Sequence, residues 1–144
     1  MDDCLVCREH RGEVELPGGP LYEDELVHGM HVPPLEDNPR PYLGHLMVTP
    51  KRHTAGLGDL MDEEAQAVGL LITRLSRALR REGAEHVYSA VIGHGVPHLH
   101  IHLLPRYAGT PQEYWWTRVD EWPDAPHGGP DEIAALVARL RTHL

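Results

Sequence analysis

The sequence predicts one domain that combines short β-strands with two helices. The chain has 144 residues, a usual length for a single domain with a core of its own. Apolar residues recur at helical spacing from about residue 59 to residue 81, and histidines alternate with aliphatic residues from residue 98 to residue 104. The first pattern is typical of a helix with one buried face, and the second is typical of a half-buried strand.

Weak strand patterns and turns occupy the first fifty residues. Residues 13–16 and 21–27 are strand candidates, and a Pro-Gly-Gly-Pro turn separates them. Four prolines in residues 33–43 exclude a central strand there, because proline cannot donate a hydrogen bond to a neighbouring strand. Residues 45–49 are expected to form a short apolar strand that ends at Pro50.

The predicted helix from Asp59 to Arg81 has the order of charges that a helix dipole favours. Acidic residues lie near its start and arginines near its end. Gly83 follows the last turn and is suited to the position just after a helix, where the backbone often turns left-handed. These features agree with the apolar spacing and make this helix the longest element of the predicted fold.

Two further strands and a second helix complete the prediction. Residues 87–92 and 96–104 are typical of an antiparallel hairpin that turns tightly at Gly93-His94-Gly95. Residues 107–129 are rich in Pro, Gly and Trp, and their tryptophans could cover the open side of a site, form a subunit interface or cover core edges. Pro130 begins a short helix, and its apolar face is formed by Ile133, Leu136, Val137 and Leu140.

Charge and hydropathy narrow the classes of partner. The formal net charge of −9 argues against non-specific binding of nucleic acid, which needs a basic face, but it allows a small phosphorylated substrate. No segment is long and apolar enough to predict a membrane span, and the acidic N-terminus lacks the pattern of a signal peptide. We therefore expect a cytoplasmic protein.

The alternating histidines are the strongest indication of function. Alternate side chains of a strand point to the same face, so His98, His100 and His102 would form a row, with neighbouring Cα atoms roughly 7 Å apart. The aliphatic residues between them would face a core on the other side. Packing alone rarely explains three imidazoles in such a row, so we expect this strand to carry the active site.

The two cysteines of the chain, Cys4 and Cys7, form a Cys-x-x-Cys motif. In a cytosolic protein this spacing is more typical of a metal site or a redox pair than of a structural disulfide. A thioredoxin-like redox site needs a helix after the motif, and residues 8–20 show no helical pattern. The motif supplies half of a tetrahedral zinc site, for which the 12 histidines offer further ligands. A pair of free thiols is the alternative.

Two separate motifs resemble the signature of the histidine triad (HIT) superfamily. They are GHLMVTPKRH at residues 44–53 and VPHLHIHLLPR at residues 96–106, in this order and with the predicted helix between them. The resemblance implies an α+β fold: an antiparallel sheet with one long helix, usually in a homodimer whose sheet continues across the interface. It covers about residues 4–106 of a single HIT-like domain over residues 1–144. About residues 107–144 then form a C-terminal extension with a short helix.

The resemblance also implies a reaction at the α-phosphorus of a nucleotide. His100 matches the nucleophile of the family, which forms a covalent nucleotidyl-imidazole intermediate. His102 matches the residue that contacts the phosphate, and His45 in the upstream motif would complete the row of hydrogen bonds. His98 belongs to the same row, and the chemical step needs no metal.

A structural zinc site is implied by the family branch that begins with Cys-x-x-Cys. Its ligands are the two cysteines, the histidine that ends the upstream motif and the first histidine of the triad. In this chain these residues are Cys4, Cys7, His53 and His98, which supply the four N and S ligands of a closed zinc site. His10 is a rival for the fourth position.

The substrate-binding positions depart from the family pattern. Many members place Asp or Asn eight residues before the residue matched by His45, to bind the ribose hydroxyls. Asp37 and Asn38 are the candidates here, although the surrounding prolines are out of register. The turn before the triad often offers Gln or Ser to the phosphate and leaving group, and here it holds His94 and Gly95. His94 could donate a proton to the leaving group, contact a charged substituent of the substrate or be an exposed turn residue.

Together these features predict a zinc-stabilised nucleotide hydrolase. Its substrate would be a nucleoside phosphoramidate or a dinucleoside polyphosphate. A nucleotidyltransferase is an alternative, because it shares the covalent intermediate and differs only in what intercepts it. A nucleotide-binding regulatory protein with little turnover is an alternative of another class, but such a protein does not need the central nucleophile.

Overall fold

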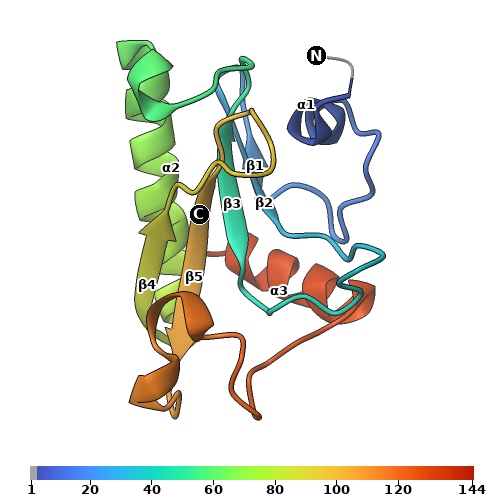
Figure 1. Ribbon diagram of the computed structural model, residues 1–144, viewed down its shortest axis with the longest axis vertical. Helices are drawn as coiled ribbons and strands as arrows, with labels where there is room; N and C mark the ends of the chain where they lie inside the picture. The colour runs from blue at the N-terminus through green and yellow to red at the C-terminus, as the bar shows by residue number, and fades with distance from the viewer. Residues whose placement is uncertain (1–2) are drawn as a thin grey trace.

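Five antiparallel strands form one sheet in the order β1–β2–β3–β5–β4 in the computed structural model, which describes residues 3–144 (Figure 1). The strands are β1 Tyr22–Glu23, β2 Val27–His31, β3 Leu46–Pro50, β4 Ala84–Ala90 and β5 Ile101–Tyr107. The helices are α1 Leu5–His10, α2 Asp62–Arg81 and α3 Pro130–Arg141, with short 3-10 turns η1 Leu57–Asp59, η2 Gln112–Tyr114 and η3 Trp116–Arg118. The predicted α+β class, antiparallel sheet, long helix and C-terminal short helix are confirmed.

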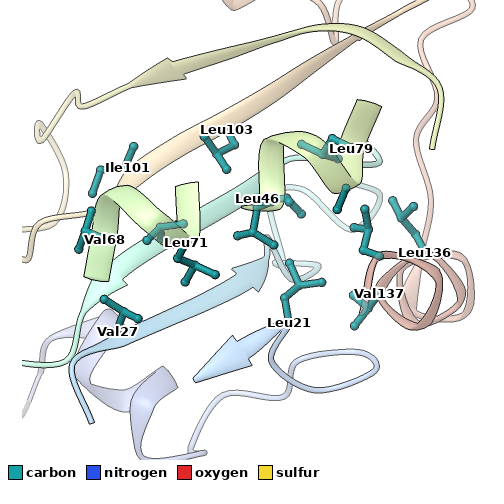
Figure 2. Packing of buried hydrophobic residues seen from close by; sticks show 14 of the residues in the cluster. Leu21, Val27, Leu46, Val68, Leu71, Leu79, Ile101, Leu103, Leu136 and Val137 are labelled. Carbon is teal, nitrogen blue, oxygen red and sulfur yellow. The ribbon is translucent and has the colours of Figure 1, made fainter. Parts of the chain in front are cut away.

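The core lies between the sheet and the two longer helices. The inner face of α2 packs its buried leucines and valine against the strands, and α3 adds its apolar face at one end of the same layer (Figure 2). Leu99, Ile101 and Leu103 are buried in this cluster, as the alternating pattern predicts. Because these side chains face α2, the histidines between them belong to the opposite side of the chain. No helix within residues 3–144 has the length and apolar character needed to cross a membrane.

The ends of α2 and α3 follow the capping chemistry of their sequences. The long helix begins at Asp62 rather than Asp59, because the Met61 N–H donates to Oε2 of Glu64 at 2.8 Å and fixes the first turn. Gly83 follows its last turn with φ +106°, a left-handed conformation that suits glycine. The second helix starts at Pro130, as predicted.

The first fifty residues contain the largest departures from the predicted elements. Residues 13–16 form no strand, and the candidate at 21–27 divides into the two-residue β1 and the first residue of β2. Strand β3 includes Pro50, whose missing N–H is tolerated because β5 pairs only with Leu46–Val48. The prediction that no helix follows Cys-x-x-Cys is wrong for the six-residue α1, which is too short to show apolar periodicity.

The connection between β4 and β5 is longer than the predicted tight turn. Strand β4 ends at Ala90 and β5 begins at Ile101, so residues 91–100 form a loop. The backbone N–H of Leu99 donates to the carbonyl of Thr54 at 2.7 Å instead of joining the ladder with β4. The first two histidines of the row therefore lie just before the strand, and only His102 lies within it.

Candidate active site and metal centre

Four predicted ligand residues meet where α1 approaches the start of β5. One ligand atom from each of Cys4, Cys7, His53 and His98 lies within 4.8 Å of the others. Cys4 occupies the N-cap position of α1 and Cys7 lies one turn later, so the start of the helix directs both sulfurs to one side. His53 follows Arg52, whose guanidinium forms two hydrogen bonds of 2.8 Å with the Glu64 carboxylate.

The spacing within this cluster fits a tetrahedral zinc ion. The Sγ–Nδ1 distances are 3.6 Å for Cys4–His98, 3.4 Å for Cys7–His53 and 3.5 Å for Cys7–His98. Zn–S bonds of about 2.3 Å and Zn–N bonds of about 2.0–2.1 Å at tetrahedral angles give S···N separations of about 3.6 Å. Burial and the neighbouring Cys4 thiol raise the pKa of Cys7. A cation at the centre would offset that effect, because metal ligands are thiolates.

His98 has both ring nitrogens engaged. Its Nε2 lies 2.8 Å from the carbonyl oxygen of Pro50, which can only accept, so Nε2 carries the proton and the Nδ1 lone pair faces the sulfurs. The residue is fully buried. Its side chain is therefore directed into the metal cluster, and its contribution to the histidine row is its backbone carbonyl.

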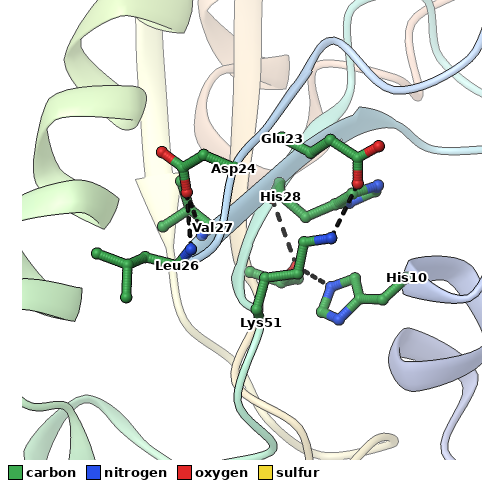
Figure 3. A network of polar contacts seen from close by, with 8 residues as sticks. His10, Glu23, Asp24, Leu26, Val27, His28 and Lys51 are labelled. Carbon is green, nitrogen blue, oxygen red and sulfur yellow. Dashed lines mark hydrogen bonds and ion pairs between the residues drawn. The ribbon is translucent and has the colours of Figure 1, made fainter.

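His10 lies beside this cluster but is not part of it. Its Nε2 is hydrogen bonded to Oγ1 of Thr49 at 2.8 Å (Figure 3). Its ring stands edge-on to that of His98, with ring centroids 5.3 Å apart. The ring also contacts His28, and burial is the main cause that lowers the pKa of His10 to about 3. His10 is thus a neutral neighbour that packs between strand and metal cluster.

The predicted catalytic row consists of His100, His102 and His45. Nδ1 of His100 donates to the backbone carbonyl of His98 at 2.8 Å, which leaves Nε2 with a free lone pair. Nδ1 of His102 shares a hydrogen bond of 2.9 Å with Nε2 of His45, and the His100 and His102 rings are 5.0 Å apart. Burial lowers the pKa of His102, and burial together with His102 lowers that of His45 to about 3. His102 and His45 are therefore neutral at physiological pH.

His31 and Gly44 position His45, and sequence reasoning did not identify either of them. His31 is buried; its Nδ1 donates to the carbonyl of Val32 at 2.8 Å, and its Nε2 accepts from the Gly44 N–H at 2.9 Å. Gly44 has φ +97°, and an added Cβ would lie 2.7 Å from Cγ of Pro105. The position of Gly44 beside a motif histidine was the available sequence signal, whereas a histidine in an apolar strand offered none.

The predicted substrate-binding residues are exposed and form two adjacent pairs that are far apart in the chain. Asp37 and Asn38 lie in a turn closed by two backbone hydrogen bonds of 3.0 Å between Leu35 and Asn38. His94 and Gly95 lie in the loop that precedes the histidine row. Across residues 3–144, no hydrogen bond or ring contact joins any of the four to His45, His100 or His102. Their substrate-binding roles stay predictions.

The chain is similar to a family of known proteins. The family model described as HIT domain matches residues 15–109, which is more than half of the chain. An HIT-like protein of Borreliella burgdorferi is 34% identical over 115 residues, covering 74% of this chain and 78% of that protein. The adenosine 5′-monophosphoramidase hnt1 of Schizosaccharomyces pombe is 31% identical over 99 residues, covering 65% of this chain and 67% of that protein.

One solved structure that shares the fold is described as Zn-bound. The Zn-bound histidine triad family protein from Mycobacterium smegmatis superposes with a TM-score of 0.71 at 25% identity. The match covers 98% of this chain and 95% of that protein. The fold is therefore shared over nearly the full length, including the segment after the second motif.

Proposed function

Because the chain belongs to the HIT domain family, we propose that it is a nucleotide hydrolase that acts at the α-phosphorus. Its substrate would be a nucleoside phosphoramidate or a dinucleoside polyphosphate. The observation that carries the proposal is the hydrogen bond of 2.8 Å from Nδ1 of His100 to the carbonyl of His98, which fixes the tautomer with a nucleophilic Nε2. The phosphoramidase named among the relatives supports the same class of substrate.

The proposed reaction divides one displacement into two. Nε2 of His100 attacks the phosphorus, a P–N bond to the imidazole forms, and the bond from phosphorus to the leaving amine or phosphate breaks. The leaving group takes a proton from a histidine of the site or from water. Water then attacks the same phosphorus, the P–N bond to His100 breaks, and the nucleoside monophosphate leaves.

His102 and His45 would bind the phosphate during both steps. Nδ1 of His102 is engaged with His45, so Nε2 of His102 is the atom that can donate to a non-bridging oxygen. The low pKa of His45, about 3, keeps its ring neutral, so each ring of this pair carries one N–H and His45 adds no positive charge. The pair can therefore orient a hydrogen bond to the phosphate without adding a second cation beside the nucleophile.

We also propose that the Cys4, Cys7, His53 and His98 cluster holds a structural zinc ion. The four N and S donors and their tetrahedral spacing support zinc, and a fully ligated ion leaves no open position for substrate. The ion would join α1 to the segments that precede α2 and β5. Two free cysteines in such a cluster suit the reducing cytoplasm, and we propose that location.

A homodimer is proposed as the working assembly. Strand β4 is an edge of the five-stranded sheet, and pairing with β4 of a second copy would continue the sheet and cover the exposed edge. Sedimentation analysis of the purified protein tests this directly.

A comparison of His100→Asn with the unaltered protein tests the catalytic assignment. The substrates are adenosine and guanosine 5′-phosphoramidates and dinucleoside polyphosphates, with and without inorganic phosphate as acceptor. Loss of the nucleophile is expected to lower kcat by at least about a thousandfold, while folding and nucleotide binding survive. Comparable turnover by the variant would overturn the mechanism. Nucleoside diphosphate formed only with phosphate present would instead identify a nucleotidyltransferase.

A further inference from the structure

Four side chains build an aromatic surface at the far end of strands β4 and β5. Trp116 stands edge-on to Tyr88, with ring centroids 5.2 Å apart. The guanidinium of Arg106 lies 3.8 Å from the ring centroid of Trp115 and donates to the Tyr88 hydroxyl at 2.8 Å. In Figure 1 the orange turns η2 and η3, which contain or border these tryptophans, lie across the lower end of the two strands. We call Tyr88, Arg106, Trp115 and Trp116 the aromatic shelf.

The register of the sheet places the aromatic shelf on the same face as His102. Ala90 pairs with His102, and Tyr88 pairs with Leu104, so these four side chains share one face. The two pairs are separated by roughly 7 Å, the rise of two residues in a strand. Ala90 is small, so no large side chain from β4 stands beside His102, and the surface between the phosphate position and Tyr88 is open on that strand.

Trp116 is held in a conformation that packing alone does not favour. Its φ is +69°, the only positive φ of a non-glycine residue within residues 3–144, and its side chain is 46% exposed. A bulky residue in the left-handed region has a strained backbone, and such residues concentrate at ligand sites. An exposed ring gains little from packing to offset that strain, which points to a ligand for the ring.

We propose that Trp116 and Tyr88 form a stacking subsite for an aromatic ring in the leaving group of the substrate. In-line displacement puts the nucleophile, the phosphorus and the leaving atom on one line. From the segment just before β5 into the strand, the order is His100, His102 and then the shelf, so a group displaced from a phosphate at His102 departs toward Tyr88. An aromatic amine or a second nucleobase has the π-face that this surface would bind. This inference rests on the proposed hydrolase activity.

The test compares two adenosine 5′-phosphoramidates that differ only in aromaticity. One carries benzylamine and the other cyclohexylmethylamine, which has the same carbon framework without a π-system. Stacking on aromatic side chains predicts that kcat/KM is about two- to tenfold higher for the benzyl compound. In Trp116→Leu the ratio should fall to about one, because leucine keeps an apolar contact but removes the π-face. Trp122→Phe is the matched control, since no ring contact joins Trp122 to Tyr88, and its ratio should stay that of the unaltered protein.

The outcomes separate this inference from the proposed function. If neither compound is hydrolysed, the proposed function fails. If both are hydrolysed equally well by the unaltered protein, the hydrolase stands and the stacking subsite is wrong. Sedimentation of Trp116→Leu adds a second readout. Equal hydrolysis together with a change from dimer to monomer would identify the shelf as a subunit interface and overturn the subsite.

Discussion

His28 is expected to make the folded protein sensitive to acid, and replacing it with leucine should remove part of that sensitivity. The side chain is 2% exposed in β2, and its Nδ1 has no hydrogen-bond partner within residues 3–144. Burial is the main cause that lowers its pKa from 6.5 to about 4, with a smaller contribution from Lys51. The folded protein therefore keeps this ring neutral at pH values where the unfolded chain would protonate it.

The sign and size of the effect follow from the two pKa values of His28. Above pH 6.5 both states are neutral, so the contribution to stability is fully present there and is lost as the pH falls toward 4. At about pH 5 the unfolded chain is protonated and the folded protein is not, which lowers the free energy of unfolding by about 2 kcal/mol. His28→Leu has no group to protonate and should escape this loss.

Urea denaturation of both proteins at about pH 7.5 and about pH 5 measures the difference. Between these two pH values the free energy of unfolding should fall by about 2 kcal/mol more in the unaltered protein than in His28→Leu. Protonation of the proposed zinc ligands affects both proteins alike. At the higher pH the free energies of unfolding of the two proteins should agree within about 1 kcal/mol. The substitution to leucine loses a ring contact with His10 but removes an unpaired buried nitrogen. Equal losses in the two proteins would refute the assignment of a buried, neutral His28.

Three further predictions concern the metal cluster and the chain before His45. Cys4→Ser combined with Cys7→Ser should abolish stoichiometric zinc, measured by elemental analysis, and lower the melting temperature as chelation does; full retention of zinc would contradict the ligand set. His98→Ala should lose zinc while His10→Ala keeps it, because His10 is bonded to a hydroxyl outside the cluster; the reverse result would exchange their roles. Gly44→Ala should lower the free energy of unfolding by about 2 kcal/mol or more. The reason is that alanine would have to adopt a φ of +97° and place its Cβ 2.7 Å from Pro105. A loss below about 0.5 kcal/mol in urea titration would exclude that strain.

The sequence best predicts those elements in which apolar residues repeat regularly over many residues. Helix α2 repeats its pattern over five turns and differs from the prediction by three residues at its start. The aliphatic residues that alternate with the histidines identify their buried side correctly even where the backbone is outside the strand. Short elements carry too few residues for a period, so α1 and the two-residue β1 could not be resolved.

The role of each side chain was harder to predict than the face of the strand or helix on which it lies. The motif positions predict that Cys4, Cys7, His53 and His98 lie together, and their ligand atoms do lie within 4.8 Å of one another. The side chain of His98 faces the metal cluster, and only its backbone carbonyl contacts the histidine row. This arrangement depends on the carbonyl of Pro50, which is 48 positions away in the chain. The support that His31 gives to the backbone before His45 likewise depends on a loop conformation that no local pattern encodes.

His98 links two parts of the molecule that are chemically separate. Its imidazole belongs to the zinc cluster, while its carbonyl accepts the proton on Nδ1 of His100. In the proposed enzyme, a zinc ion that held the His98 ring would also steady the backbone acceptor on which the tautomer of His100 depends. A substitution that displaced His98 would therefore disturb the metal cluster and the orientation of the His100 ring together.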